Sequence, residues 1–255
     1  MSIAILYICT GKYAQFFDSF YQSAERFLLD GHEKHYFVFT DKDNLTTAPN
    51  VTLIHRDCQG FPMDSLLRFD MFLSIKEQLR TYNYTFFFNA NMQIVASIGE
   101  AFLPKRLTAV IHPGYYKKPV WRYPYERNKR SKAYIPAHGK DYRYFMGSLN
   151  GGRTTDYLQL AQTCSQWTHN DLEQQLIAVY HDESYLNRYL RDHDCQPLSP
   201  AYAYIEGKQM PFEQKIILRD KTKLDPYFDK GRDHSLWGRL KKGIRIISDA
   251  IKWYL

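Results

Sequence analysis

Cysteine is scarce in this chain, and no long hydrophobic run occurs in it. The 255 residues include four cysteines, which lie far apart at Cys9, Cys58, Cys164 and Cys195. This spacing supplies neither paired metal ligands nor a disulfide framework, so we expect reduced thiols in a cytoplasmic protein. No apolar stretch reaches the ~18 residues of a membrane-spanning helix, and residues 1–4 lead directly into a strand rather than into a signal peptide. These absences argue against a secreted protein, a membrane span and a cysteine-based metal centre.

Acidic residues are outnumbered as well. The chain has 34 Lys and Arg against 27 Asp and Glu, which gives a net charge of +7 and a pI of about 9.0. A basic protein is attracted to nucleic acid, to anionic membranes or to anionic substrates, and charge alone does not separate these partners. Aromatic residues make up 16% of the chain, which is typical of a globular protein rather than a disordered one. The length suits one large domain or two small ones.

The first part of the chain predicts a parallel strand–helix–strand unit. Residues 3–9 form an apolar strand, residues 16–28 carry aromatic side chains at helical spacing, and residues 35–41 form a second strand. The turn after the first strand then lies at the carboxyl edge of the sheet, where ligands gather in open α/β folds. Tyr13 in this turn either stacks on a nucleobase or packs at the start of the helix, and the sequence leaves both interpretations open.

A third strand is expected at residues 51–55, followed by a helix with Asp64 as its N-cap that runs to Leu79. Arg68 lies in the first turn of this helix, where a cation opposes the helix dipole. Its position favours a negative partner, either a phosphate or a carboxylate. A solvated arginine is the plainer alternative.

Residues 84–88 are a continuous run of aromatic and β-branched residues, which is typical of a strand buried on both faces. The run ends at Asn89 and Asn91, which project to the same side of the backbone and can therefore address one ligand. Amides carry no charge, so the pair is a poor site for a hard divalent cation, which prefers anionic oxygen. An Asn-rich turn is the alternative interpretation.

The middle of the chain is less regular. Residues 117–132 are basic and aromatic without a period, which predicts a loop that orders on binding. The same composition suits single-stranded nucleic acid, but no RNA-binding motif accompanies it. Residues 142–148 predict a strand that leads to Asn150-Gly151-Gly152, where glycine permits unusual geometry or a close approach. Helices are expected at residues 157–167 and 171–180.

Two adjacent carboxylates, Asp182 and Glu183, follow His181 at the start of another predicted helix. Acids at a helix start commonly cap it. Paired carboxylates in unequal environments also suit glycosyl chemistry, in which positive charge builds on an anomeric carbon. A later cationic run around Lys221 either folds over a phosphate or is a solvated segment.

Residues 235–255 predict a basic amphipathic helix with Trp237 and Trp253 near its two ends. Five basic residues against one acid, Asp249, give this segment a charge of +4. Such a helix fits the face of an anionic membrane, and docking on the domain or on a partner is the alternative. The apolar stripe is formed by Leu236, Leu240, Ile244, Ile247, Ile251 and Tyr254, and the basic residues are Arg239, Lys241, Lys242, Arg245 and Lys252.

Several segments in order resemble glycosyltransferase family 6, the family of the blood-group A and B transferases, the α1,3-galactosyltransferases and their smaller bacterial relatives. The resemblance covers about residues 3–226. It implies an α/β protein with a GT-A fold, a Rossmann-like mixed sheet flanked by helices, over residues 1–225, followed by a basic amphipathic tail over residues 226–255. The segments are His35–Asp41 (HYFVFTD), His112–Gly114 (HPG), Tyr125–Arg127 (YER), Ala133–Pro136 (AYIP) and His181–Ser184 (HDES) with Asn187.

The resemblance implies catalytic roles for the acidic pair. Glu183 matches the carboxylate beneath the anomeric carbon, which either forms a covalent glycosyl-enzyme or stabilises a short-lived ion pair. Asp182 matches the carboxylate that binds donor-sugar hydroxyls. Asn89-Ala90-Asn91 stands where vertebrate members carry Asp-X-Asp, and this form, known in bacterial members, implies an enzyme that needs neither a divalent metal nor another cofactor.

The resemblance also implies a donor site. Tyr13 matches the aromatic residue near uracil, Arg68 the arginine near the donor, and Lys221 the lysine that neutralises the diphosphate. Met146-Gly147-Ser148 matches the segment that chooses between galactose and N-acetylgalactosamine. Ser148 in place of a glycine leaves less room for an acetamido group, which favours galactose.

The function implied is retaining α-1,3-glycosyl transfer of galactose, or N-acetylgalactosamine, from UDP-Gal or UDP-GalNAc to a galactose-terminated glycan, with or without fucose. His112, Tyr180 and, in a looser alignment, Glu206 match acceptor contacts. The expected acceptor is an oligosaccharide or a lipid-linked glycan of lipopolysaccharide biosynthesis. Residues 235–255 are expected to hold the enzyme as a peripheral protein on the anionic inner face of the inner membrane.

Two other classes of function compete with this one. A catalytically silent module that binds sugar nucleotide or glycan would share the fold, but a binder has no need of a carboxylate such as Glu183 beneath the anomeric carbon. A nucleic-acid-binding protein would use the basic loop, and we expect no nucleic-acid partner.

Overall fold

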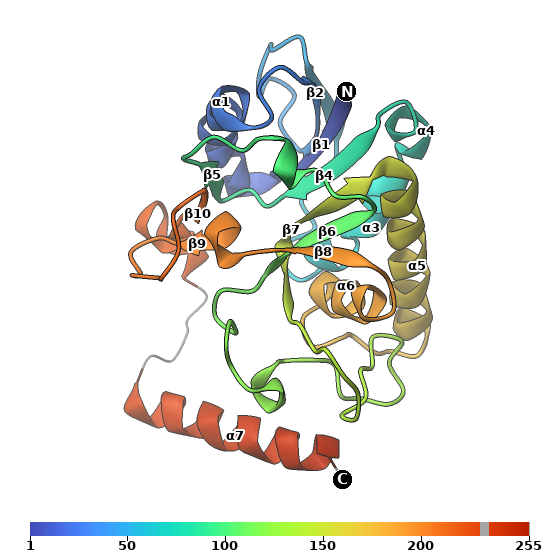
Figure 1. Cartoon of the computed structure of the whole chain (residues 1–255), viewed down its shortest axis with the longest axis vertical. Coiled ribbons are helices and arrows are strands. Elements are labelled where there is room, and N and C mark those ends of the chain that lie inside the picture. The colour runs from blue at the N-terminus through green and yellow to red at the C-terminus, as the bar shows by residue number, and fades with distance from the viewer. Residues whose placement is uncertain (230–234, 255) are drawn as a thin grey trace.

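Seven strands form a mixed central sheet in the order β3-β2-β1-β4-β7-β6-β8 (Figure 1). The computed structural model describes residues 1–229 and 235–254; within the last helix, the side chains at positions 236, 238–240, 242 and 245 lie outside the described set. Four strands run parallel at one side, namely β1 (Ser2–Ile8), β2 (Glu33–Thr40), β3 (Val51–His55) and β4 (Tyr84–Phe88). The other three are β6 (Leu107–Ile111), β7 (Phe145–Arg153), which is antiparallel to both β4 and β6, and β8 (Cys195–Leu198), which is parallel to β6.

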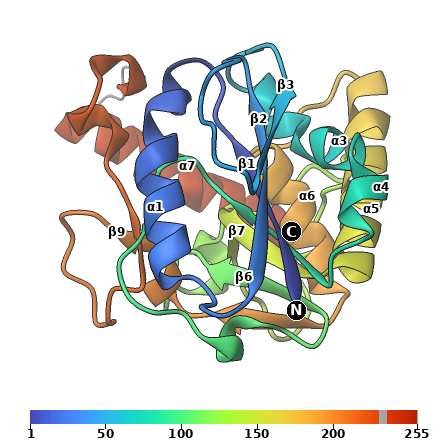
Figure 2. The same cartoon turned by 90° about the horizontal axis from the view of Figure 1, so that it is seen from above.

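Helices cover both faces of this sheet (Figure 2). The 3-10 turn η1 (Gly11–Phe16) and α1 (Phe17–Phe27) lie on one face, and α5 (Thr154–Glu173) and α6 (Asp182–Arg191) lie on the other. Alternate residues of β1 join opposite cores: Ile5 packs with α1, and Leu6 packs with α5 and α6. A strand buried on both faces must be apolar throughout, which is why this part of the chain was predictable.

The single helix expected from Asp64 to Leu79 is instead three short helices, so that prediction was wrong. They are α2 (Met63–Leu66), α3 (Arg68–Leu73) and α4 (Lys76–Leu79). Asp64 does not cap a helix, because its carboxylate accepts hydrogen bonds from the backbone N–H groups of Gln59 and Gly60, each at 3.1 Å. The carboxylate therefore holds the loop that precedes the helices.

β7 begins at Phe145 rather than at residue 142, and it continues through both glycines. Gly151 lies opposite Phe86 of β4, and a Cβ there would lie 2.5 Å from the carbonyl oxygen of Thr85. The close approach that these glycines permit is therefore to a neighbouring strand, not to a ligand.

The helix expected at residues 171–180 is also absent from the described structure. α5 ends at Glu173, and Gln175 takes a left-handed conformation with a φ of 57°. The carboxylate of Asp171, at the end of α5, accepts hydrogen bonds from the Ser131 hydroxyl at 2.5 Å and from the backbone N–H of Lys132 at 2.8 Å. These contacts tie the end of α5 to the basic loop, and the chain leaves the helix beside them.

A small second sheet joins the end of β4 to the late part of the chain. It consists of β5 (Met92–Ile94), β10 (Ile216–Leu218) and β9 (Tyr204–Ile205) in the order β5-β10-β9. The remaining short turns are η2 (Glu100–Phe102), η3 (Val120–Arg122), η4 (Pro200–Ala203), η5 (Lys221–Lys223) and η6 (Pro226–Phe228). Within residues 117–132 the structure has η3 and one isolated bridge, from Glu126 to Tyr134, so the predicted irregular course is confirmed. Its ordering on binding stays a prediction.

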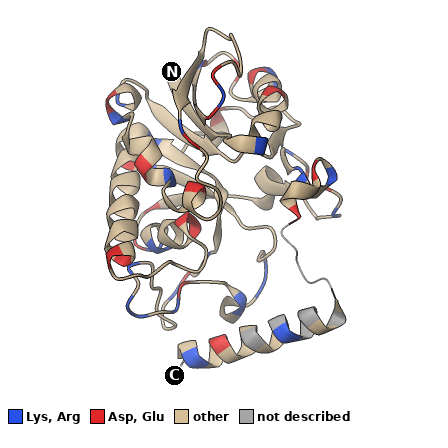
Figure 3. Ribbon diagram, turned by 180° about the vertical axis from the view of Figure 1, so that it is seen from behind, with Lys and Arg blue, Asp and Glu red and all other residues tan. Residues whose placement is uncertain are grey.

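The predicted C-terminal helix is confirmed as α7 (Leu236–Tyr254). It lies along one end of the molecule (Figures 1 and 3), where the indole N–H of Trp253 donates to the carbonyl oxygen of Ile135 at 2.7 Å. No helix within residues 1–229 and 235–254 is long and apolar enough to cross a bilayer. Five residues assigned to the stripe or its basic flanks have side chains outside the described set: Leu236, Arg239, Leu240, Lys242 and Arg245. The division of the chain near residue 226 stays a prediction.

Candidate active site

A cavity of about 400 Å³ opens at the carboxyl ends of β1 and β4, beside the first turn of α6. Asn91, His112 and Glu206 are outside its lining. The other ten site residues expected from the sequence line it: Tyr13, Arg68, Asn89, Met146, Gly147, Ser148, Tyr180, Asp182, Glu183 and Lys221.

Both carboxylate oxygens of Glu183 are held by hydrogen bonds. The Tyr144 hydroxyl donates to one oxygen at 2.5 Å, and the backbone N–H of Gly147 donates to the other at 2.7 Å. Asn187, one turn further along α6, exchanges two hydrogen bonds of 2.8 Å with the backbone of Phe145 in β7. The helix start is thereby fastened to the strand, which fixes the position of the carboxylate.

Burial raises the pKa of both acids. The pKa of Glu183 is raised to about 7, chiefly by loss of hydration and further by the charge of Asp182, although the hydrogen bonds from Tyr144 and Gly147 act in the opposite direction. The pKa of Asp182 is raised to about 6, again by burial, with the Arg68 charge opposing the rise. Two neighbouring carboxylates in different surroundings are an arrangement that enzymes use to separate the roles of paired acids.

The negative partner expected for Arg68 is Asp182. A guanidinium nitrogen of Arg68 lies 2.6 Å from an Asp182 carboxylate oxygen, with both side chains buried. The same nitrogen donates to the carbonyl oxygen of Gly147 at 2.8 Å, and the guanidinium lies over the ring of Phe87 at 4.1 Å. The Nε of Arg68 and the Oγ of Ser148 are buried without a hydrogen-bond partner in the described part of the chain.

An aromatic and cationic group forms another wall of the cavity. The Lys221 ammonium donates to the Tyr13 hydroxyl at 3.1 Å and lies 5.0 Å from the centre of that ring. Phe228 of η6 packs edge-to-face against Tyr13 with the ring centres 4.9 Å apart. Tyr13 therefore has an aromatic neighbour and a cation beside it at the ligand edge of the sheet.

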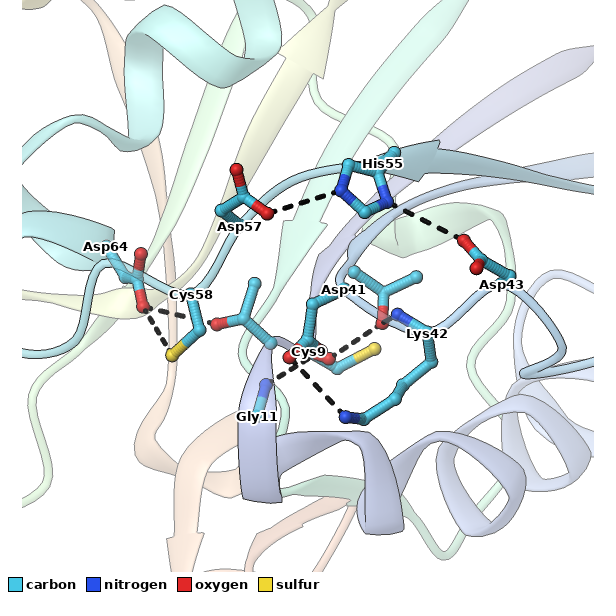
Figure 4. Close-up of polar contacts among 11 residues, drawn as sticks. Cys9, Gly11, Asp41, Lys42, Asp43, His55, Asp57, Cys58 and Asp64 are labelled. Carbon is cyan, nitrogen blue, oxygen red and sulfur yellow. Dashed lines mark hydrogen bonds and ion pairs between the residues drawn. The ribbon is translucent and has the colours of Figure 1, made fainter.

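The loop that carries Tyr13 is fixed by two acids, Asp41 just after β2 and Asp64 in α2 (Figure 4). Gly11 has a φ of 55° and donates its backbone N–H to Asp41 at 2.9 Å. On the other side, the Thr10 hydroxyl donates to Asp64 at 3.2 Å. Asp41 of the HYFVFTD segment thus holds the loop after β1.

The two amides after β4 bind each other. The Asn89 amide donates to the side-chain oxygen of Asn91 at 2.7 Å, and the Asn91 amide donates to the carbonyl oxygen of Arg219 at 2.7 Å. They fasten the end of β4 to the segment that leads to Lys221. No group of three or more His, Cys, Asp or Glu that could hold a metal occurs among the described residues. These donors do not fit a divalent cation.

Of the three residues matched to acceptor contacts, only Tyr180 lines the cavity; His112 and Glu206 do not. Tyr180 lines the cavity and is 41% exposed. The His112 ring lies outside the cavity lining and packs against Tyr144, with ring centres 5.8 Å apart. Burial lowers the pKa of His112 to about 4. Glu206 accepts the backbone N–H of Asp220 at 2.6 Å, so it supports the turn before Lys221, and its role at the acceptor stays a prediction.

The sequence reading missed Tyr144 and gave no role to Asn187. Alternate residues of an extended chain point to the same side. This alternation places Tyr144 on the same side as Met146 and Ser148, and it could have marked Tyr144 as a site residue. No comparable pattern marks Phe61, which is 62% exposed at the cavity wall and packs edge-to-face on His181 with ring centres 4.8 Å apart.

Comparison with known proteins gives consistent matches. The model of glycosyltransferase family 6 matches residues 1–223. The O-antigen biosynthesis glycosyltransferase WbnI of Escherichia coli is 40% identical over 245 residues, which cover 95% of this chain and 100% of that protein.

Two mammalian relatives are more distant. Globoside alpha-1,3-N-acetylgalactosaminyltransferase 1 of Homo sapiens is 30% identical over 229 residues, or 85% of this chain and 65% of that protein. Histo-blood group ABO system transferase 1 of Rattus norvegicus is 30% identical over 213 residues, or 80% of this chain and 61% of that protein. The match spans less than two thirds of the length of each.

Replacing Tyr144 by Phe is expected to raise the pKa of Glu183 further above about 7, because the lost hydrogen bond favours the ionised carboxylate. An NMR titration of the carboxyl carbon, assigned by its absence in Glu183→Gln, measures this. Tyr123→Phe is the control, since Tyr123 packs on the Tyr144 ring. An unchanged pKa in Tyr144→Phe would contradict the assigned contact.

Proposed function

Because the chain belongs to glycosyltransferase family 6, a family of retaining α-1,3 transferases with the GT-A fold, we propose that it transfers galactose from UDP-galactose to the 3-hydroxyl of a galactose-terminated glycan, without a metal ion. UDP-N-acetylgalactosamine is the alternative donor. The observation that carries the proposal is Glu183, a partly buried carboxylate held by Tyr144 and Gly147 at the wall of the cavity. A catalytically silent binding module has no use for a carboxylate that is held in this way.

The chemistry proposed is a displacement at the anomeric carbon. The bond from this carbon to the diphosphate breaks, and its electron pair leaves with UDP. Glu183 stabilises the positive charge that develops, either by bonding to the carbon or as an ion pair. The acceptor 3-hydroxyl then bonds to the carbon on the face that UDP has left, and where Glu183 has bonded to the carbon, that bond breaks and its electron pair returns to the carboxylate. The hydroxyl proton passes to the departed diphosphate, and the configuration is retained.

Protein cations take the charge of the leaving diphosphate. Lys221 stands at the Tyr13 wall of the cavity, where an ammonium group can bind phosphate oxygens. The Asn89–Asn91 pair carries no charge to hold a metal. Arg68 pairs with Asp182 rather than with the diphosphate. This ion pair holds the Asp182 carboxylate in a position to accept hydrogen bonds from donor-sugar hydroxyls.

The preference for galactose rests on Ser148. Ser148 is only 5% exposed at the cavity wall, and its hydroxyl has no protein partner among the described residues, so a sugar hydroxyl would satisfy it. Met146 and Gly147 stand beside it in the same wall. A serine side chain there takes up room that an acetamido group would need.

The acceptor is proposed by comparison with a relative. WbnI of Escherichia coli is named for O-antigen biosynthesis and matches this chain over nearly its whole length. We extend that role to this chain as growth of a lipid-linked surface glycan. Tyr180, partly exposed at the cavity wall, offers a ring on which the terminal galactose can pack.

A lipid-linked acceptor would place the enzyme at a membrane, and α7 supports this. Ile244, Ile247 and Ile251 are each more than half exposed, and their spacing puts them on one side of the helix. The exposed Lys241 and Lys252 flank this row. An apolar row between lysines fits an anionic bilayer surface.

The first experiment is UDP release from UDP-galactose and UDP-N-acetylgalactosamine in excess EDTA, with and without a fucosylated galactoside. We expect acceptor-stimulated release that persists in EDTA, and a fall of roughly 10²- to 10³-fold in Glu183→Gln, which loses the charge beneath the anomeric carbon. Donor binding with no release by the wild-type protein would favour the binding-module alternative.

Ser148→Gly is expected to shift the donor preference. Removing the hydroxymethyl group should raise the ratio of kcat/KM for UDP-N-acetylgalactosamine to that for UDP-galactose by about tenfold, the scale of one small group in a binding pocket. Ser65→Gly, in a different wall of the same cavity, is the matched control. If the two variants give the same ratio as the wild type, Ser148 does not select the donor.

Ile247→Ser/Ile251→Ser is expected to release the protein from vesicles that contain phosphatidylglycerol. Both positions are exposed, so the fold should be unaffected while the apolar contact with lipid is lost. Flotation of vesicles with bound protein measures this, with phosphatidylcholine vesicles as the neutral reference. Wild-type retention by the variant would show that α7 does not insert.

A further inference from the structure

The loop before β7 carries almost only positive charge. Between Pro113 and Lys140 the single acid is Glu126, and it is buried, with its carboxylate accepting hydrogen bonds from the backbone N–H groups of Val179 and Asn128, each at 2.8 Å. Asp141 is the first exposed carboxylate after this segment. Within residues 117–132 of this loop, six cations are exposed: Lys117, Lys118, Arg122, Lys129, Arg130 and Lys132.

This loop is the part of the domain on which α7 rests. Trp253 donates its indole N–H to Ile135 and packs against the ring of Tyr125, with ring centres 6.1 Å apart. The guanidinium of Arg127 lies 4.8 Å from the centre of the Trp253 ring. Lys and Arg positions lie along the loops next to α7 in Figure 3. The loop cations and α7 therefore occupy the same end of the molecule.

The docked and exposed sides of α7 are opposite. Trp253 and Ala250 are buried against the domain, while Ile244, Ile247 and Ile251 are exposed. At 3.6 residues per turn, the exposed row falls on the side of the helix away from Trp253. The row of Ile244, Ile247 and Ile251 on α7 therefore faces away from the domain, and the loop on which α7 packs carries the exposed cations.

We propose that residues 117–132 and α7 form one membrane-binding surface, in which the loop cations bind the phosphates of anionic lipids and the α7 row enters the bilayer. The proposal rests on the membrane association proposed above and extends it to the loop. Basic residues near an anionic leaflet add to the affinity of an inserted apolar helix.

This surface also orients the cavity. The basic loop begins just after His112 and Tyr115, and the buried Glu126 in its middle accepts the N–H of Val179, the neighbour of Tyr180. Tyr180, at the cavity wall, is therefore one residue from a contact with the loop that would lie on the bilayer. This contact places an edge of the cavity next to the proposed surface.

Single-stranded nucleic acid is the other partner with which a basic, aromatic loop could pair. Nucleic acid is the less favoured partner because the exposed isoleucines of α7 lie beside the cations. A row of apolar side chains would not contribute to binding a polyanion. An anionic membrane accounts for the charge and for the apolar row together.

The test compares two triple variants of equal charge. Lys117→Gln/Lys118→Gln/Arg122→Gln removes cations from the loop, and Arg26→Gln/Lys76→Gln/Lys105→Gln removes exposed cations elsewhere, including one on α1 and one on α4, which lie away from α7 (Figure 1). Partition onto vesicles of phosphatidylcholine with phosphatidylglycerol is measured at low and high salt. The loop variant should bind about a hundredfold more weakly at low salt, at about fivefold per residue, and the control should bind within about twofold of the wild type.

Five outcomes decide between the proposal and its alternatives. Equal loss in both triple variants, or no loss in the loop variant, would overturn the composite surface even if the α7 isoleucines prove necessary. Tighter binding to a single-stranded oligonucleotide than to the vesicles would also overturn it. So would a wild-type dimer in gel filtration that Ile247→Ser/Ile251→Ser dissociates, because a second copy would then cover the row. Selective loss in the loop variant supports the surface, and UDP release to a free oligosaccharide, measured in parallel, reports separately on the transferase.

Discussion

The buried ion pair between Arg68 and Asp182 is the interaction on which the rest of the site depends. It joins α3 to α6, and the bond from Arg68 to the carbonyl oxygen of Gly147 adds β7. Arg68 begins α3, where the helix dipole disfavours a cation, whereas Asp182 begins α6, where the dipole favours an anion. Removing either partner would leave the other charge buried and unpaired, at a cost of about 3–5 kcal/mol. Glu183 follows Asp182 directly, so its position depends on this pair.

Glu183, for which we propose the catalytic role, opposes folding in its ionised form. The pKa of Glu183 in the folded protein, about 7, lies above its ordinary value of 4.5. The protonated form is therefore favoured in the folded state, and the stability this group contributes is complete below pH 4.5 and is lost as pH rises through about 7. The ionised carboxylate that the proposed chemistry uses is the form that is less stable in the folded protein. Hydrogen bonds from Tyr144 and Gly147 limit the loss.

The sequence allowed much of the sheet to be predicted, because burial on both faces forces continuous apolar runs such as Ile3–Ile8 and Tyr84–Phe88. It was less informative where a local signal competes with a distant contact. Asp64 has the composition of a cap, but a preceding loop takes its oxygens. The ten cavity residues were found through family resemblance. Alternation groups Tyr144 with Met146 and Ser148, but it does not show the hydrogen bond to Glu183, 39 positions away, that gives Tyr144 its place in the site.

The amide pair after β4 has a consequence for the history of the site. Asn89→Asp would replace the donor that now binds Asn91 with a second acceptor. Asn91→Asp would remove the donor that binds the carbonyl oxygen of Arg219. Either single substitution loses one of the two hydrogen bonds that fasten the end of β4 to the segment before Lys221. A lineage that exchanges amides for acids at this turn would therefore lose a hydrogen bond at its first step.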